Sequence, residues 1–325
     1  MKFLFLFLSF LICSSSLLDN VRKEIIDKAL LYLPKRVNVN FLKMSNEMLN
    51  AKIEYSMNEE ESAYFVYKWI AQNIEYNCNY IIEEDSSAEI SLAYKEGKGG
   101  TIGITGLFSR LCELLNVESN IITGLTKIAT YNYKNKTDLI VIKDYAWNSV
   151  FVGEQYYLID SIKGAGSCEK NRFYKSQNDI FFGMNPKDSI RFHFPNEKKW
   201  QLLSDPVTQD EFKSMALISE GFFNYFKTFS PDVQTLKNVR EIRLEMTFDK
   251  PIDKIEIYPS FDALNYDKNE LPMDYIFLDE PTINNGTCSI SFWVGETGYL
   301  DVSISVNDKE SFRVTYESYY SPNNS

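Results

Sequence analysis

The feature that most constrains the fold is a change in hydrophobic periodicity along the chain. In the first half, apolar residues recur every three or four positions, as Ala63, Val66 and Ile70 do, which is the spacing of one face of an α-helix. From Glu241 onward, apolar and polar residues alternate, which is the period of a half-buried β-strand. Helices first and strands later predict an α+β protein.

Shorter patterns divide the chain further. Helical patterns cover Val21 to Leu33, a segment that begins near Asn58, and the apolar stripe Ile104 to Leu115. Strand patterns follow over residues 120–126, 139–152 and 155–160. We therefore predict a first domain over residues 20–205 and a helical linker over residues 206–238. Residues 239–320 are predicted to form a C-terminal β-sandwich of about six or seven strands.

The charge balance excludes several classes of partner. The 325 residues carry a formal net charge of −11, whereas a nucleic-acid-binding protein needs basic surfaces that displace counterions. The same acidity disfavours binding to an anionic membrane surface. We expect no nucleic-acid partner and no membrane-spanning segment in the mature chain.

The N-terminus predicts export. One lysine precedes an apolar run from Phe3 to Cys13, and small residues follow it, as in a secretory signal peptide over residues 1–16. The run is shorter than the ~20 residues of a spanning helix; a short buried helix or strand is the alternative. Three N-x-S/T triplets, at Asn135, Asn285 and Asn323, are glycosylation candidates in an exported protein. We therefore expect a secreted protein or one of the endomembrane lumen.

Four cysteines remain after removal of such a signal: Cys78, Cys112, Cys168 and Cys288. They allow three full pairings, and the sequence does not choose among them. We expect one disulfide or none, because Cys112 lies on the apolar face of a predicted helix. The spacing matches no metal motif, so neither a metal nor another cofactor is expected.

Several motifs occur in an order that resembles a known family. These are YKWIAQNIEYN (67–77), the glycine-rich KGGTIGITG with its helix (98 onward), ITGLTK (122–127), YAWNSV (145–150), YYLIDS (156–161), FHFP (192–195) and WQLLSDPVTQDEF (200–212). Together they resemble the transglutaminase-like superfamily, and the last two resemble its kyphoscoliosis-peptidase-like branch. The resemblance covers roughly residues 45 to 215. It implies a papain-related core in which N-terminal helices pack on an antiparallel sheet.

The resemblance also locates a catalytic triad, and two of its positions are changed. Members use a cysteine at the start of the central helix, a histidine before Ala-Trp-Asn, and an aspartate at the end of the next strand. In this chain the three positions fall on Thr101, Tyr145 and Asp160. A threonine hydroxyl is far less acidic than a thiol and needs a strong adjacent base. Tyrosine, with a pKa near about 10, is protonated at neutral pH and does not supply that base.

Other residues offer little replacement chemistry. Cys112 lies eleven residues beyond Thr101, about 16 Å along a helix, and is better explained as core. The only histidine, His193, follows Asp160 and lies outside the strand pair that supplies the family's base, so a structural role is expected for it. The glycine-rich loop lacks the Lys-Ser/Thr ending of a phosphate-binding loop.

The strand pair itself has a predictable register. A two-residue turn at Gly153-Glu154 pairs Val152 with Gln155 and continues to Trp147 opposite Asp160. Tyr145 then lies one diagonal step from Asp160 and within reach of its carboxylate. Tyr145 is accordingly expected to fill the former cleft as a structural plug. The alternative is that these are ordinary strand residues.

These observations predict a catalytically inactive, secreted transglutaminase-like protein that acts by binding a protein or a glycan. The alternative function is an active cysteine protease or transglutaminase-like enzyme with a relocated nucleophile.

Overall fold

The structure is a computed structural model of the whole chain, and it describes residues 18–79, 86–129, 140–169, 171–233, 235–237, 241–248, 251–263, 281–293, 298–307 and 310–319. The predicted signal segment and the triplets at Asn135 and Asn323 lie outside these residues. The chain divides into two compact units, Met1–Ile122 with Ala146–Asn185 and Thr123–Tyr145 with Pro186–Ser325. This division differs from the predicted one at residues 206–238, because the two long strands β3 (Glu118–Ala129) and β4 (Ile140–Val152) each contribute to both units.

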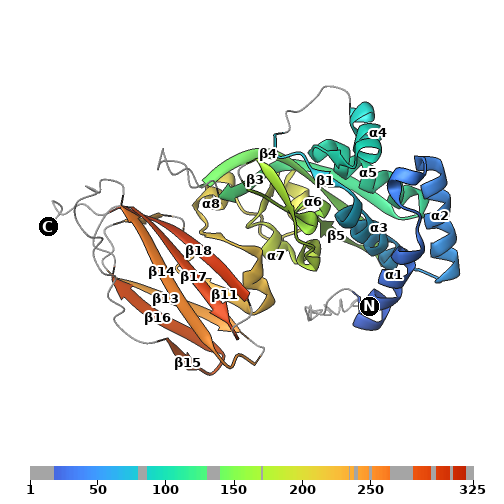
Figure 1. Cartoon of the computed structure of the whole chain (residues 1–325). Helices are drawn as coiled ribbons and strands as arrows, with labels where there is room; N and C mark the ends of the chain where they lie inside the picture. The colour runs from blue at the N-terminus through green and yellow to red at the C-terminus, as the bar shows by residue number, and fades with distance from the viewer. Residues whose placement is uncertain are drawn as a thin grey trace, which may run out of the picture. The chain divides into compact units, whose positions relative to one another are not determined.

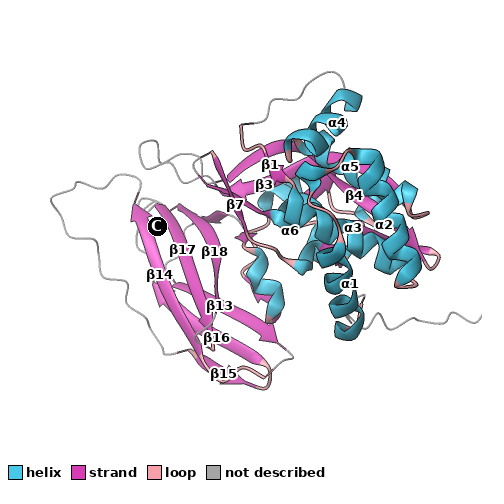
Figure 2. Ribbon diagram, turned by 45° about the vertical axis from the view of Figure 1, so that its right-hand side comes forward, coloured by secondary structure: helices cyan, strands magenta, loops and turns pink. Residues whose placement is uncertain are grey.

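Helices gather in the first unit (Figure 2). They are α1 (Asn20–Tyr32), α2 (Phe41–Glu54), α3 (Glu59–Asn73), α4 (Ser86–Glu96), α5 (Thr101–Leu114) and the short α6 (Ser161–Ala165). Helix α3 begins as predicted: Asn58 is its N-cap, forms a reciprocal capping box with Glu61, and precedes three acidic residues in the first turn. The periodic residues Ala63, Val66 and Ile70 are fully buried, so α3 is a core helix of this unit.

Helix α2 is an element that hydrophobic periodicity alone does not reveal. Its buried residues are Met44, Ser45, Met48 and Ala51, while Leu42, Leu49 and Ile53 are exposed. The apolar residues therefore fall on two opposite faces, and no single stripe stands out in the sequence.

The glycine-rich stretch allows two helices to approach closely. A Cβ added at Gly106 of α5 would lie 2.5 Å from side-chain atoms of Ile90, and one at Gly103 would lie 2.9 Å from the carbonyl oxygen of Glu89. Because both neighbours belong to α4, these two glycines of α5 form the surface against which α4 packs.

The predicted strand pair is confirmed. Strand β4 and strand β5 (Gln155–Ile159) are antiparallel, with Val152 opposite Gln155 and Asn148 opposite Ile159. The turn residues Gly153 and Glu154 both have positive φ angles, as a two-residue turn of type I′ requires. These strands belong to a five-stranded sheet of order β8-β5-β4-β3-β9, in which β8 is Phe182–Met184 and β9 is His193–Pro195.

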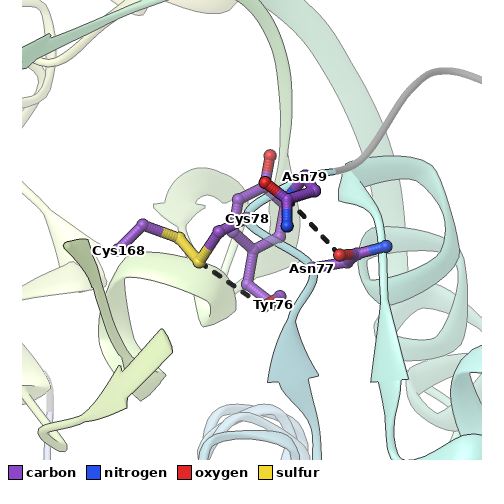
Figure 3. Close-up of a disulfide and its surroundings, with 5 residues drawn as sticks. All are labelled: Tyr76, Asn77, Cys78, Asn79 and Cys168. Atoms are coloured by element: carbon purple, nitrogen blue, oxygen red, sulfur yellow. Dashed lines mark hydrogen bonds between the residues drawn. A yellow bond between two sulfur atoms is a disulfide. The ribbon is translucent and has the colours of Figure 1, made fainter. Parts of the chain in front are cut away.

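One disulfide joins Cys78 to Cys168 within the first unit (Figure 3). Cys78 follows β1 (Glu75–Tyr76), and Cys168 lies in β6 (Gly166–Glu169), which forms a hairpin with β7 (Arg172–Lys175). The pairing closes a loop across a sequence separation of 90 residues. Cys112 and Cys288 are reduced and buried.

The second unit contains two sheets that share one hydrophobic core. The first has the order β10-β18-β17-β14, with β12 also pairing with β18, and the second has the order β11-β13-β16-β15. Figure 1 labels most of these strands, which run from orange to red. Their bounds are β10 Leu217–Ile218, β11 Phe226–Ser230, β12 Thr235–Lys237, β13 Glu241–Phe248, β14 Ile255–Ala263, β15 Thr282–Asn284, β16 Thr287–Trp293, β17 Gly298–Val306 and β18 Glu310–Tyr319. The predicted alternation is confirmed in β13, where Ile242, Leu244 and Met246 are buried.

The predicted helical linker over residues 206–238 is wrong. Only α8 (Gln209–Ser214) is α-helical there, and Glu220–Asn224 forms a 3-10 helix. Strands β10, β11 and β12 occupy much of the remainder and pair with β18 or β13. Aromatic residues of this segment pack in the core of the second unit, where Phe222 stacks on Phe226 and meets Phe229 edge to face. Tertiary packing of these rings therefore overrides the local helical pattern.

Candidate functional site

The first triad position lies at the start of the central helix α5. Gly100 is the N-cap with an extended backbone and gives no side-chain cap. The preceding residue, Gly99, is held by the parallel pair of β1 with β2 (Lys98–Gly99), and the N–H of Asn77 donates to its carbonyl at 2.8 Å. Thr101 is only 4% exposed, and its carbonyl accepts from the hydroxyl of Thr105 at 2.7 Å. The nucleophile position is thus a buried hydroxyl at a helix start.

The third position, Asp160, is the N-cap of α6. Its Oδ1 accepts from the backbone N–H groups of Ile162 and Lys163, both at 2.9 Å. Asp160 is 2% exposed, and its carboxylate satisfies two N–H groups of the first turn that have no partner within the helix. The retained aspartate therefore has a structural role that requires no catalysis.

The charge of Asp160 acts on two tyrosines of the same unit. Burial is the main cause that raises the pKa of Tyr67 well above its ordinary value, and the carboxylates of Asp179 and Asp160 add to it. The pKa of Tyr76 is raised in the same way, by burial first and then by Asp160. Both phenols are therefore held protonated, and neither serves as a base at neutral pH.

Asn148 anchors the central helix, although sequence reasoning assigned it no role. Its Nδ2 donates to the carbonyl of Thr105 and to the hydroxyl of Ser109, each at 3.1 Å, and to the carbonyl of Asn120 at 3.4 Å. Because Nδ2 carries two hydrogens, they are shared among these three oxygens. Asn148 is fully buried and so joins β4, α5 and β3 through one amide. Its place directly after the tryptophan of the YAWN motif is the only sequence signal for it.

The second triad position, Tyr145, lies in the other unit and contacts the chain's only histidine. The rings of Tyr145 and His193 stack with centroids 5.9 Å apart and planes inclined by 23°. Tyr145 is 8% exposed and His193 is 3% exposed. His193 pairs with Thr126 of β3 at the edge of the sheet, a neighbourhood that no local sequence signal predicts. His193 lies in β9, outside the pair of β4 and β5, as expected, but its ring contact with Tyr145 was not expected from the sequence.

The four cysteines that the structure describes offer no nucleophile. Cys78 and Cys168 are joined in the disulfide, and Cys112 and Cys288 are fully buried. Burial raises the pKa of the Cys112 thiol, and it raises that of Cys288 to about 11. A buried thiol with a raised pKa is not a thiolate at neutral pH.

No group of three acidic, histidine or cysteine side chains among the residues that the structure describes is arranged to hold a metal ion. None of the helices in this part of the chain has both the length and the apolar composition needed to cross a bilayer.

Comparison with known protein families shows which family this helix-and-sheet domain resembles. Residues 47–161, which include α3, α5 and all three triad positions, match the family model "Transglutaminase-like superfamily". The chain therefore contains a transglutaminase-like domain.

Two curated relatives show which branch of the superfamily this chain resembles. The chain is 27% identical over 182 residues to "Kyphoscoliosis peptidase" of Mus musculus, an alignment that covers 55% of this chain and 27% of the relative. It is 25% identical over 186 residues to "Hillarin" of Drosophila melanogaster, which covers 53% of this chain and 22% of that protein. Over roughly half of its length the chain is thus similar to the kyphoscoliosis-peptidase-like branch of the transglutaminase-like superfamily.

The matched regions are only part of each relative. The chain spans about a quarter of the length of the curated relatives it matches. A solved structure described as "Crystal structure of a TGase" is 17% identical to this chain, with a TM-score of 0.26 over an alignment that covers 51% of this chain and 44% of that one.

Proposed function

We propose that this protein is a catalytically inactive transglutaminase-like protein that is exported and acts by binding another protein or a glycan. The observation that carries the proposal is the state of the four described cysteines, since two form a disulfide and two are buried with raised pKa values. An enzyme with a relocated thiol nucleophile needs an accessible thiolate.

The triad positions add to the argument. Thr101, Tyr145 and Asp160 are all less than a tenth exposed, so none of them is presented to a substrate in solution. A threonine hydroxyl needs a strong adjacent base, and the position that holds the family's histidine is Tyr145 in this chain. We therefore place the binding role on other surfaces, and the two C-terminal sheets, which we interpret as a β-sandwich, are the candidate for it.

Two observations support export. Disulfides persist in oxidising compartments, and Cys168, one partner of the disulfide, is exposed to solvent. Asn285 of the triplet Asn285-Gly286-Thr287 is exposed in the turn between β15 and β16, where an oligosaccharyltransferase can reach it. Expression in a eukaryotic host should yield a secreted chain that lacks its first 15 to 19 residues or so. Asn285→Gln should remove one glycan, and a mature chain that still begins at Met1 would contradict export.

The inactive state is tested with the purified full chain. Amine transfer and peptide hydrolysis should both be absent, and an iodoacetamide probe should label no cysteine before unfolding. Thr101→Cys alone should restore little, whereas Thr101→Cys with Tyr145→His should give measurable thiol reactivity. Turnover by the unmodified protein that disappears with Cys112→Ser or Cys288→Ser would support the relocated nucleophile instead.

Tyr145 provides a separate test of the plug interpretation. Its phenol is buried, and a buried hydroxyl is generally hydrogen-bonded. Tyr145→Phe keeps the ring that stacks on His193 and removes only the hydroxyl, so the free energy of unfolding should fall by about 1–3 kcal/mol. Chemical denaturation measures this loss. Tyr156→Phe is the matched control, because Tyr156 is 37% exposed, and an equal loss in both variants would refute the buried hydroxyl as the cause.

A further inference from the structure

We propose that one face of the second C-terminal sheet binds a neutral glycan through rows of hydroxyl groups. This sheet has the strand order β11-β13-β16-β15, and Figure 2 shows β13, β16 and β15 side by side. The surface consists of Thr228, Thr247, Thr282, Thr287, Ser289 and Ser291, which we call the hydroxyl face. The inference rests on the proposed binding role, and it names the class of ligand and the surface that binds it.

Strand register places these hydroxyl groups in continuous rows. Thr228, Thr247 and Thr287 lie opposite one another across β11, β13 and β16. Ser289 lies opposite Thr282 of β15 and two positions along β16 from Thr287. Because directly paired residues and alternate residues of one strand share a face, these side chains lie on the same side of the sheet.

The opposite side of the same sheet is the hydrophobic core of the second unit. The intervening residues of β13 and β16 that are buried there are Leu244, Met246, Cys288 and Ile290. The hydroxyl face therefore points away from the core. Its outer strands present Thr228 and Thr282, which are both exposed to solvent.

Hydrogen bonds within the face hold its hydroxyl groups in place. The hydroxyl oxygens of Thr228 and Thr247 are 2.6 Å apart, and those of Thr282 and Ser289 are 2.9 Å apart. In each pair one hydroxyl donates to the other, so the accepting hydroxyl keeps its own hydrogen for a ligand. Groups that are ordered before binding lose less conformational entropy when a ligand arrives.

The spacing of the rows suits a chain of sugars. Neighbouring strands lie about 4.7–4.9 Å apart, and alternate residues of one strand lie about 6.6–6.8 Å apart. These separations are comparable with the width of a sugar ring, so a ring that lies flat on the sheet meets hydroxyl groups of more than one strand. Sugar hydroxyls both donate and accept hydrogen bonds, as serine and threonine hydroxyls do.

The charges beside the hydroxyl face favour a neutral ligand. Arg243, opposite Ser291, and Glu245, opposite Ser289, form an ion pair at 2.9 Å. Because the two charges offset each other, the pair adds hydrogen-bond donors and acceptors without net charge. Glu241, which is exposed on the same strand, adds a negative charge. A sulfated or phosphorylated glycan would thus meet no excess of positive charge among these described side chains.

A protein partner fits this surface less well. Protein interfaces are anchored by aromatic and apolar side chains, and serine is depleted in them. The three rows that pass through Thr247, Glu245 and Arg243 contain hydroxyl, amide, carboxylate and guanidinium groups and no aromatic side chain. The chemistry of these rows is therefore that of a polar, many-hydroxyl ligand.

Affinity electrophoresis of the full mature chain tests the proposal. Each gel contains one neutral polysaccharide, namely mannan, galactan, β-glucan or dextran, and a further gel contains the sulfated polysaccharide heparin. We expect at least one neutral polysaccharide to retard the chain and heparin to leave its migration unchanged. A chain that no neutral polysaccharide retards would overturn the proposal, and so would a chain that only heparin retards.

A double variant tests whether the hydroxyl face is the binding surface. Thr247→Val with Ser289→Ala removes one hydroxyl from each hydrogen-bonded pair and should raise the dissociation constant at least about tenfold, because hydrogen bonds to the ligand are lost. Ser303→Ala with Ser305→Ala is the matched control, because it removes two half-buried hydroxyls from β17 in the other sheet, and it should leave the constant unchanged. Both variants keep the triplet that begins at Asn285, so glycosylation there is the same.

Thermal unfolding checks that the variants keep their fold. Thr228→Val with Thr282→Val, at exposed positions of the outer strands, repeats the binding test without a change in the two central strands. Glycan binding that persists in both face variants would overturn the assignment to the hydroxyl face.

The outcomes also separate this inference from the proposed function. A chain that binds a protein through this face and binds no glycan would overturn the inference while the proposed binding role stands. Thiol labelling and turnover test catalytic inactivity independently of either result.

Discussion

Removal of the disulfide should destabilise the first unit by several kilocalories per mole. The bond between Cys78 and Cys168 closes a loop across a separation of 90 residues. In the chain-entropy description, a closed loop of about 100 residues stabilises the folded state by about 4.7 kcal/mol, and measured effects are typically about 2–4 kcal/mol. We therefore expect Cys78→Ser with Cys168→Ser to lower the free energy of unfolding of this unit by about 2–4 kcal/mol. For a unit of this size, the midpoint of thermal unfolding should fall by about 5–15 °C.

Chemical denaturation of the wild-type and double-variant proteins measures this change. Treatment of the wild type with a thiol reductant should reproduce the midpoint of the variant, while the same treatment of the variant should shift nothing. The slope of the free energy against denaturant is a further readout, because a chain without the cross-link exposes more surface on unfolding. A loss below about 1 kcal/mol would refute the reasoning, since the loop would then contribute almost no entropy. A reductant effect that persists in the variant would also refute it.

Three further outcomes are expected. Asp160→Asn should retain most of the stability, because asparagine also accepts hydrogen bonds at an N-cap. Asp160→Ala should lower the free energy of unfolding by about 1–3 kcal/mol in chemical denaturation. Equal losses in the two variants would contradict the capping role. Burial, and then the charge of Glu61, raises the pKa of Glu60 to about 7. The folded protein therefore favours the neutral form of Glu60. The stability that this gives is full below the pKa of Glu60 in the unfolded chain and is lost as pH rises through about 7. Glu60→Gln should therefore be more stable than the wild type at about pH 8 and equal to it near pH 4, and a pH-independent difference would contradict this. Thiol titration of the native protein should detect neither Cys112 nor Cys288, and unfolding should release both.

Local patterns predicted those elements whose geometry is set by neighbouring residues. The hairpin of β4 and β5 follows from two turn residues and the alternation around them, and the structure has the predicted register. The start of α3 follows from Asn58 and the acidic residues after it. In both cases one short segment contains all the information, so the sequence alone is sufficient.

Elements that depend on distant partners were not predictable in the same way. The segment from Phe222 to Phe229 has a helical pattern, yet its rings pack in a core between two sheets, and β11 forms because β13 offers an edge. Tyr145 and His193, whose rings stack, are 48 positions apart in the sequence (193 minus 145), and no local spacing encodes their contact. Asn148 is a similar case, because its three acceptors come from two other elements.

The fold constrains the side chain at one triad position more than at another. Asp160 caps two N–H groups at the start of α6 and is itself buried, so a carboxylate or amide is favoured there whether or not the protein catalyses a reaction. Thr101 follows an N-cap that uses no side chain, so the helix start places no such chemical demand on this residue. Loss of catalysis would thus leave the aspartate under structural constraint while the helix start no longer required a thiol. A retained aspartate in this fold is therefore weak evidence for activity, and the residue at the helix start is the informative one.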